Sequence, residues 1–489
     1  MSVTAALARH AAERPDAEAL VFEDIRLSWA ALDREISRLA RAIAGTSPPG
    51  GGIALHLPTG PVLAIAFLAA ARAGREAQVL DPGWPPALTR DILAALRPAL
   101  TWTTDAGLAI EGAVLVADPF AMPAWAPASG NAAIDEPDEA LPFYVGFTSG
   151  STGLPKGYRR SHRSWTESFR GDAIEFGIGS GDVVLAPGTL THSLFLYALV
   201  HGLHAGARVI LSRRFRPDAA LRLAERERAS ILYGVPTQLQ MMIAAAGERS
   251  LPAMRWVLSS GAKWPHAARG ALARLFPGAR FAEFYGASET SFITVAKADE
   301  HVPESSVGRA FAGATVTIRD RTGRRLAPGR TGFVFVESPF LFMNYATGDS
   351  TDLIHRDGAL SVGDIGFLDA HGFLHLVGRA ARKIVTSGKN VYPEEVERVL
   401  ERHPAVAAAA VSGLADTQRG ERLAALLALR VGATVTRTDL IVHVRQALPL
   451  YKVPRLYGVV EDWPLTRSGK TDFEALAKAW PAGGFRPLA

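Results

Sequence analysis

The sequence predicts an α/β protein: a large N-terminal domain of two layered α/β subdomains plus a small β subdomain, followed by a small α+β C-terminal domain. Two observations carry this prediction. Apolar runs of strand length alternate with amphipathic segments of helix length over residues 28–233, as in parallel sheets covered on both faces. After residue 379, roughly a hundred residues contain fresh strand and helix patterns, enough for a separate domain. We therefore predict domains at 1–379 and 380–489.

The first predicted elements precede residue 81. Ser28 can accept a capping hydrogen bond at the start of a helix with one apolar face, which we expect to end at Gly45. A strand over 53–57, an apolar helix over 61–73 and a strand over 77–80 follow. The alternation of strands and helices indicates a parallel sheet.

The same alternation returns further along the chain and then changes character. Strands are expected at 183–185, 209–211 and 231–233, with helices at 194–203 and 219–228. Between residues 311 and 339, short apolar runs are broken by glycine- and proline-containing turns. This texture predicts a small antiparallel β unit.

Composition narrows the classes of function. The chain has 489 residues, 48% of them hydrophobic, and a formal net charge of +5 from scattered basic residues, which favours anionic small molecules over a nucleic acid as partners. With no cysteine, it has no disulfide, no thiolate metal site and no cysteine nucleophile. Residues 1–20 are interrupted by charges and do not read as a signal peptide. The apolar run 61–71 is too short to span a bilayer, so a cytoplasmic location is the default expectation.

The segment Phe147 to Gly157 has the composition of a phosphate-binding loop. A strand over 141–147 would deliver it at a strand end. Its glycines let backbone N–H groups face one guest, its hydroxyls add donors, and its lysine adds a positive charge. It is not the Walker-type loop, because Pro155 precedes the lysine. The candidate phosphate ligands are Thr148, Ser149, Gly150, Ser151, Thr152, Gly153 and Lys156.

Three further segments carry groups suited to a nucleotide. Residues 284–290 follow a strand-like run and contain an aromatic ring, a glycine, a hydroxyl and a carboxylate, which can stack a purine, touch a phosphate and hold Mg²⁺; a strand edge with a solvated glutamate is the alternative. Asp364 can accept from ribose hydroxyls or simply serve turn chemistry. Lys470 lies in an exposed turn, where a lysine is ordinarily solvated.

Taken in order from residue 53 to residue 471, these segments resemble the adenylate-forming superfamily, which includes acyl-CoA synthetases, luciferases and the adenylation domains of peptide synthetases. The resemblance implies a mobile C-terminal domain and an ATP site to which the loop supplies phosphate ligands. It assigns the remaining roles as follows: Tyr285 and Gly286 to adenine, Ser288 to the α-phosphate, Glu289 to Mg²⁺, Asp364 to ribose, Arg379 to ribose or phosphate, Lys470 to catalysis of adenylation, and His192 and Gly261 to the acyl and nucleotide pocket. For His192, capping of the following helix is an equal alternative.

Two positions depart from the family pattern. Ala381 stands where most members have an Asp or Lys hinge residue, which leaves the domain rotation undetermined. Gly332-Phe333 replaces the usual Gly-Glu of the small β unit, with a local effect on packing expected.

The resemblance implies a ligase that uses ATP and Mg²⁺ to convert a carboxylic acid to acyl-AMP, releases pyrophosphate, and transfers the acyl group to coenzyme A. Residues 191–197 contain no acidic residue to pair with an amino acid's ammonium, which favours a fatty or aromatic acid. Two alternatives stay open: an adenylation enzyme that loads a carrier protein's phosphopantetheine, and a nucleotide-binding relative without turnover. Either a monomer or a homodimer is compatible with the sequence.

Overall fold

The computed structural model describes the chain except for residues 109, 111, 122–133, 149–154, 262, 265–267, 349, 387–388, 417–419, 467–469 and 489. The chain forms two compact units. The first comprises Met1–Val316 and Val336–Thr351, and the second comprises Thr317–Phe335 and Asp352–Ala489. Residues 352–379 therefore group with the C-terminal residues by compactness, while the predicted boundary at 379 stays a prediction.

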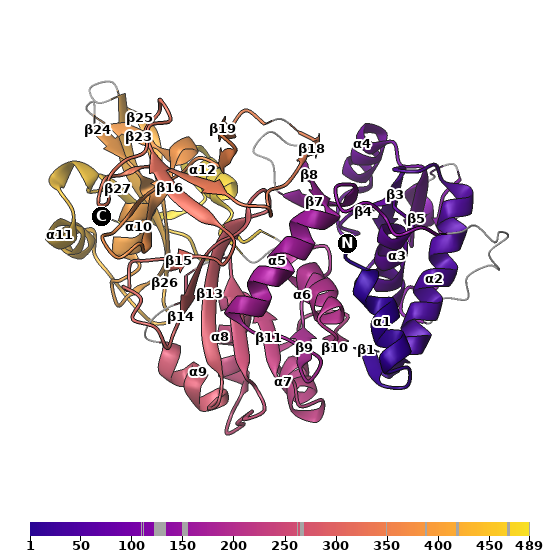
Figure 1. Cartoon of the computed structure of the whole chain (residues 1–489). Helices are drawn as coiled ribbons and strands as arrows, with labels where there is room; N and C mark the ends of the chain where they lie inside the picture. The colour runs from indigo at the N-terminus through magenta and orange to yellow at the C-terminus, as the bar shows by residue number, and fades with distance from the viewer. Residues whose placement is uncertain are drawn as a thin grey trace. The chain divides into compact units, whose positions relative to one another are not determined.

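One sheet of the first unit contains the two strands that flank the predicted phosphate loop, β7 and β8 (Figure 1). Its core is parallel, and β8 and β18 extend it antiparallel. The order is β18 (Asn344–Thr347), β8 (Lys156–Ser161), β7 (Pro142–Thr148), β4 (Glu76–Val79), β3 (Gly52–His56), β5 (Leu100–Thr103) and β6 (Val114–Leu115). The accompanying helices are α2 (Trp29–Thr46), α3 (Pro61–Arg72) and α4 (Pro86–Leu96). Nearly every residue of α3 is buried, as expected for a helix that is apolar on all sides.

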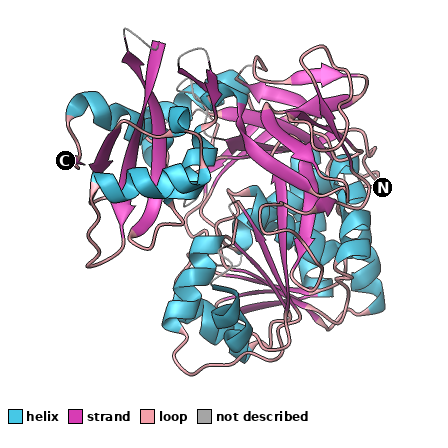
Figure 2. Cartoon of the chain, turned by 90° about the vertical axis from the view of Figure 1, so that its left-hand side faces the viewer, coloured by secondary structure: helices cyan, strands magenta, loops and turns pink. Residues whose placement is uncertain are grey.

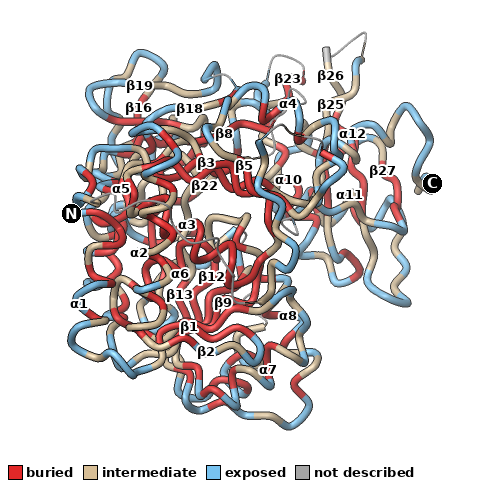
Figure 3. Tube along the Cα trace, turned by 90° about the vertical axis from the view of Figure 1, so that its right-hand side faces the viewer, coloured by how far each residue is buried: buried red, intermediate tan, exposed pale blue. Residues whose placement is uncertain are grey.

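The second sheet of this unit is also parallel in its middle, with antiparallel strands at both edges. The order is β15 (Arg309–Ala310), β14 (Ser291–Lys297), β13 (Arg280–Ala287), β12 (Trp256–Ser260), β11 (Ile231–Gly234), β9 (Val183–Ala186), β10 (Arg208–Leu211), β1 (Glu18–Phe22) and β2 (Ile25–Ser28). Figure 3 shows its central strands among the buried parts of the chain.

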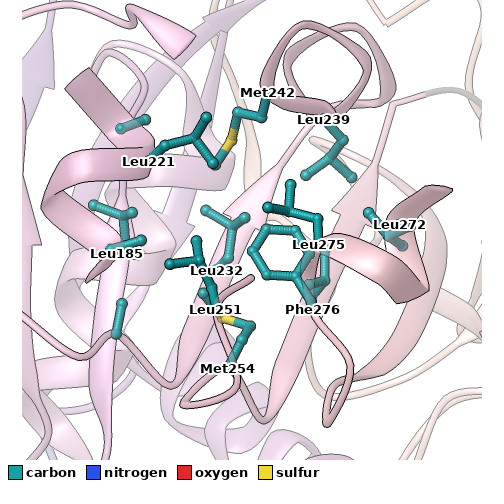
Figure 4. Close-up of a cluster of buried hydrophobic side chains, with 14 of the residues drawn as sticks. Leu185, Leu221, Leu232, Leu239, Met242, Leu251, Met254, Leu272, Leu275 and Phe276 are labelled. Atoms are coloured by element: carbon teal, nitrogen blue, oxygen red, sulfur yellow. The ribbon is translucent and has the colours of Figure 1, made fainter. Parts of the chain in front are cut away.

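Helices cover both faces of this second sheet (Figure 2). On one face, α7 (Pro217–Arg226), α8 (Pro236–Ala245) and α9 (Arg269–Leu275) pack against the strands in an apolar core that includes Leu185 and Leu232 (Figure 4). On the other face lies α6 (Ser193–His204), because a Cβ on its Gly202 would approach Val209 Cγ2 to 2.7 Å. Two further α-helices among the described residues of the unit are α1 (Ala5–Glu13) and α5 (His162–Glu175).

The second unit contains two smaller sheets. One has the order β19 (Ile354–Arg356), β20 (Ala359–Ser361), β17 (Gly332–Glu337), β21 (Asp364–Leu368) and β22 (Leu374–Arg379), with β16 (Thr315–Arg319) paired to β17. The other has the order β24 (Lys389–Val391), β23 (Ile384–Thr386), β26 (Gly420–Leu429), β27 (Leu456–Val459) and β28 (Arg486–Pro487), with β25 (Val406–Asp416) paired to β26. Its helices are α10 (Pro393–Leu400), α11 (Arg437–Ala447) and α12 (Phe473–Ala482).

The structure confirms the predicted α/β class and most predicted elements within one or two residues. The Ser28 cap is confirmed, because Ala31 N–H donates to Ser28 Oγ at 3.2 Å. The helix continues past the expected stop at Gly45 to Thr46, since glycine there adopts helical geometry and Ser47 takes the C-cap position. In the part of the chain that the structure describes, no helix is long and apolar enough to cross a membrane.

The apolar core under α7 to α9 gives a stability prediction. Leu232 is fully buried in the middle of β11, so Leu232→Ala should lower the free energy of unfolding by about 2–5 kcal/mol, through lost burial and the cavity left behind. Urea denaturation followed by tryptophan fluorescence measures this. Leu141, which is 41% exposed, is the control, and Leu141→Ala should change the free energy by less than about 0.5 kcal/mol. Equal losses in the two variants would contradict the assignment of this core.

Candidate active site

The second sheet has a topological switch point between β9 and β11. The chain passes from β9 to β10 on one side, whereas β11 leads to β12 and β13 on the other. In open parallel sheets, ligands bind outside the carboxyl ends of the strands at such a point. His192 follows β9 at the start of α6, and Val235 follows β11 at the start of α8. The fold thus puts both residues at this edge, and Gly261 follows the neighbouring β12 with φ +98°.

His192 occupies the N-cap position of α6 in an extended conformation. Its side chain makes no capping hydrogen bond. His192 therefore stands at the N-cap position that the capping alternative predicted, but the prediction that its imidazole caps the helix is wrong.

The predicted phosphate loop joins two antiparallel strands of the first sheet. Thr148 ends β7, Lys156 begins β8, and the two residues pair directly across the hairpin. The expectation that a buried strand delivers the loop is confirmed. Ser149, Gly150, Ser151, Thr152 and Gly153 lie outside the described residues.

Side chains at alternate positions of β8 lie on one face of the strand and are buried: Lys156, Tyr158 and Arg160. The hydroxyl of Tyr158 lies 2.9 Å from that of Tyr144 on β7. A Cβ at Gly146 would come within 2.2 Å of both hydroxyls, so only glycine leaves room for this pair. Burial raises the pKa of both tyrosines, which keeps the phenols protonated.

Tyr158 also connects the first sheet to two predicted parts of the site. The side chains of Ser193, beside His192, and of Ser288 both act to lower the pKa of the Tyr158 phenol, which places them near its hydroxyl. The two residues belong to α6 and to the turn after β13. The start of α6 and the turn after β13 therefore both lie near Tyr158, on the strand that follows the phosphate loop.

The turn that carries Ser288 and Glu289 joins β13 to β14. Thr290 Oγ1 accepts from Ala287 N–H at 3.1 Å and closes the turn. A Cβ at Gly286 would stand 1.8 Å from the carbonyl oxygen of Ser291, which itself has φ +58°. The hairpin backbone thus requires this glycine, and the ladder shifts register between Tyr285 and Gly286. Such a bulge re-aims side chains at a strand end.

Residues 340–347 form a segment that reaches both predicted phosphate-binding regions. Tyr345 donates from its hydroxyl to Glu289 Oε1 at 2.7 Å, and Phe342 N–H donates to the Glu289 carbonyl at 2.8 Å. Lys156 Nζ lies 5.5 Å from the centroid of the Tyr345 ring. Lys156 and Glu289 therefore share one neighbour despite their separation in sequence. The sequence alone does not indicate Tyr345, because its partner Glu289 lies 56 residues away and no local pattern marks the contact.

The remaining predicted residues belong to the second unit. Asp364 and Arg379 pair across β21 and β22, where Arg379 Nε donates to Asp364 Oδ1 at 2.9 Å. Lys470 is exposed on a short turn before α12, in which Thr466 N–H donates to the Lys470 carbonyl at 2.7 Å. The turn continues into the Asp472 cap of α12. Asp364 and Arg379 are thus brought together, and Lys470 is held by backbone hydrogen bonds on its own turn.

Among the described residues, no group of three or more His, Cys, Asp or Glu side chains is arranged to hold a metal ion. Glu289 still fits Mg²⁺, because this ion binds oxygen ligands and commonly uses one or two carboxylates together with substrate phosphates. The hydroxyl of Tyr345 orients that carboxylate.

Comparison with known proteins agrees with this arrangement. Residues 7–346 match the family model described as AMP-binding enzyme, and residues 395–470 match the AMP-binding enzyme C-terminal domain. The uncharacterized acyl-CoA ligase YhfT of Bacillus subtilis is 35% identical over 479 residues, 96% of each chain. Feruloyl-CoA synthase of an Amycolatopsis species is 31% identical, covering 94% of this chain and 96% of its own. The o-succinylbenzoate CoA synthetase (MenE) of B. subtilis, solved with its acyl-adenylate intermediate, superposes with TM-score 0.83 at 25% identity, covering 96% of this chain and 97% of its own.

This chain belongs to the AMP-binding enzyme family. The predicted membership of the adenylate-forming superfamily, in its acyl-CoA synthetase branch, is confirmed. So is the predicted class of enzyme, an AMP-forming acid–thiol ligase that adenylates an acid and then forms the CoA thioester.

The hairpin at Gly286 gives a second prediction. In Gly286→Ala the added methyl must push the Ser291 backbone away and displace the Ser288–Glu289 turn. Because a shift of about 1 Å in positioning groups can cost about a hundredfold in rate, acid-dependent exchange of pyrophosphate into ATP should fall by that order. The control is Gly179→Ala, where the added Cβ meets nothing within 4 Å. Wild-type exchange by Gly286→Ala would contradict the assignment.

Proposed function

We propose that this enzyme activates a carboxylic acid lacking an α-amino group with ATP and Mg²⁺, and transfers the acyl group to coenzyme A. In the first half-reaction a carboxylate oxygen attacks the α-phosphorus of ATP and pyrophosphate leaves. In the second, the thiol sulfur attacks the acyl carbon and AMP leaves. The link from Lys156 through Tyr345 to Glu289 is the single observation that carries this proposal, because it joins a cation, a fixed carboxylate and the ends of the phosphate loop.

Negative charge on the phosphates has to be offset as the acid attacks. In the first unit, we assign the offset of phosphate charge to the loop from Thr148 to Lys156. The hydroxyl of Ser288 would contact the α-phosphate. Glu289 would hold Mg²⁺, which, when bound, neutralises part of the phosphate charge. Tyr285 and Gly286 would contact adenine.

The second unit contributes the other proposed nucleotide contacts. Asp364 would accept from the ribose hydroxyls, and Arg379 Nε already orients its carboxylate. Lys470 would supply a positive charge during adenylation only. An exposed turn suits this role, since a side chain that serves one half-reaction must be able to leave.

The acid pocket is proposed at the switch point, near His192 and Gly261. Asp172 contacts the middle of α6, where its Oδ2 accepts from the Tyr197 hydroxyl at 3.0 Å. Burial raises the pKa of Asp172 well above its usual range, which favours its neutral form. It therefore offers no fixed negative charge to an ammonium group. A fatty or aromatic acid fits this environment better than an amino acid.

The function is tested with wild-type protein, ATP, Mg²⁺, labelled pyrophosphate and a panel of fatty and aromatic acids. At least one acid should support pyrophosphate exchange, and addition of CoA should yield the thioester. A protein that binds ATP without exchange would be the non-catalytic relative. Thioester formation on a carrier protein's phosphopantetheine, with none on CoA, would select the carrier-loading alternative.

The acid specificity gives a third prediction. Whichever acid is best in the panel, its α-amino analogue should support at least about tenfold less exchange, because its ammonium would lose water without gaining a partner. The comparison of 3-phenylpropanoate with phenylalanine is one matched pair. Equal kcat/KM values for a pair would contradict the proposed acid class.

A fourth prediction separates the two half-reactions. Because the proposed role of Lys470 is confined to adenylation, Lys470→Ala should lower acyl-AMP formation by about a hundredfold or more. Thioester formation from supplied acyl-AMP and CoA should survive. Lys478→Ala, on the exposed part of α12, is the control and should leave both steps unchanged. Equal loss of both half-reactions in Lys470→Ala would contradict the assignment.

A further inference from the structure

Arg160 is buried on β8, four residues beyond the phosphate-loop lysine, with 2% of its surface exposed. Its guanidinium makes three hydrogen bonds: Nε to Ser164 Oγ at 3.2 Å, Nη1 to the Ser288 carbonyl at 3.0 Å and Nη2 to the Phe340 carbonyl at 2.6 Å. The last two acceptors lie 128 and 180 residues away in the sequence. One side chain therefore connects three distant stretches of the first unit.

The two distant stretches are those that fix Glu289. Ser288 immediately precedes Glu289, and the segment that begins at Phe340 supplies the Phe342 N–H and the Tyr345 hydroxyl bonded to Glu289. The guanidinium is planar, and its donors point in fixed directions. Arg160 can thus set the distance between the turn after β13 and the segment 340–347, which together determine where the Glu289 carboxylate points.

Arg160 is unusual because its charge is buried among the described residues without an ion pair to a carboxylate. A fully buried arginine is ordinarily paired with a carboxylate, yet among the ion pairs of the described residues Arg160 takes part in none. Burial lowers its pKa to about 10, and the neighbouring Tyr158, Tyr144 and Glu289 oppose that shift. Arg160 therefore remains a cation at neutral pH. A positive charge that is held by carbonyl dipoles is still available to act on Glu289 and on phosphates.

We propose that Arg160 is a positioning residue of the adenylation site: it holds the Ser288–Glu289 turn, and with it the metal-binding carboxylate, at the strand that follows the phosphate loop. This inference rests on the proposed role of Glu289 in holding Mg²⁺. Arginine is needed because a lysine ammonium cannot reach two carbonyls in a fixed plane, although it keeps the charge.

A purely structural role for Arg160 predicts a different result, and Arg75 provides the matched control. Arg75 is also buried, with 6% exposure, and its guanidinium donates to the carbonyls of Ala73 at 2.6 Å and Ser47 at 2.7 Å. Burial lowers its pKa as well. It lies between α3 and β4, and none of its hydrogen bonds involves a proposed site residue. Arg75→Met therefore measures what loss of a buried, carbonyl-bound arginine does to stability alone.

The experiment compares the full-length wild type, Arg160→Met, Arg160→Lys and Arg75→Met. Mn²⁺ serves as the probe, and its binding in the presence of ATP without an acid is followed by electron paramagnetic resonance. Loss of a group that orients a metal ligand costs about 10- to 100-fold in metal affinity. The Mn²⁺ dissociation constant should rise by that factor in Arg160→Met and by less in Arg160→Lys, while Arg75→Met stays within twofold of wild type. Thermal unfolding should show lower stability in both methionine variants.

The inference is overturned if Arg160→Met binds Mn²⁺ within twofold of wild type, or if Arg75→Met weakens binding as much. Should Arg160→Met not fold, Ser164→Ala, which removes the hydrogen bond to Nε, and Arg160→Lys decide the question by the same titration. Failure of the proposed function gives a separate result, namely no pyrophosphate exchange by the wild type with any acid. Mn²⁺ binding tests Arg160 in either case.

Discussion

The constraint on which the first unit depends is the attachment of the Ser288–Glu289 turn to the strand after the phosphate loop. The two sheets of this unit fold around separate apolar cores, and each contributes only part of the predicted nucleotide site. Aromatic contacts run between them from Tyr144 through Trp165 to Tyr197, and buried hydrogen bonds of Arg160 and Tyr345 also connect them. Groups that act on one phosphate chain must be fixed to within about half an ångström. The buried hydrogen bonds supply that precision, because the surrounding low dielectric strengthens them and makes their loss costly.

The parallel order of the strands explains why the predicted site residues stand just after strand ends. Parallel strands bring their carboxyl ends to one edge of the sheet. The segments after β9, β11 and β12 therefore begin side by side because the strands themselves are paired. The core between β11 and α7 to α9 keeps these strands in register, and the opposite face of the sheet is left to α6. Apolar packing thereby positions the start of α6, and the polar network positions the proposed phosphate-binding groups of the Ser288–Glu289 turn.

The sequence contained most of the fold, because strand and helix periodicities are local properties. The Ser28 cap, the buried strand before the phosphate loop and the layered order of elements were all predictable for that reason. The resemblance assigns roles to the motif residues, which stay predictions, and the structure adds that Gly286 serves the hairpin backbone. Tyr345 and Arg160 were not predictable in these roles. Their partners lie 56 to 180 residues away, and nothing local to either residue indicates such a contact.

The positive groups proposed for adenylation differ in how firmly the chain holds them, and this difference fits a reaction in two steps. Arg160 is buried and bonded to three stretches of the first unit, so its charge is present in every state of that unit. Lys470 is exposed on a turn of the second unit and is fixed there by backbone bonds. Nucleotide and metal must stay bound while the carboxylate attacks, and this requires a charge that is held permanently in place, as that of Arg160 is. A charge needed in one step only can be carried by a separate compact unit, since domain motion can remove it without disturbing the rest.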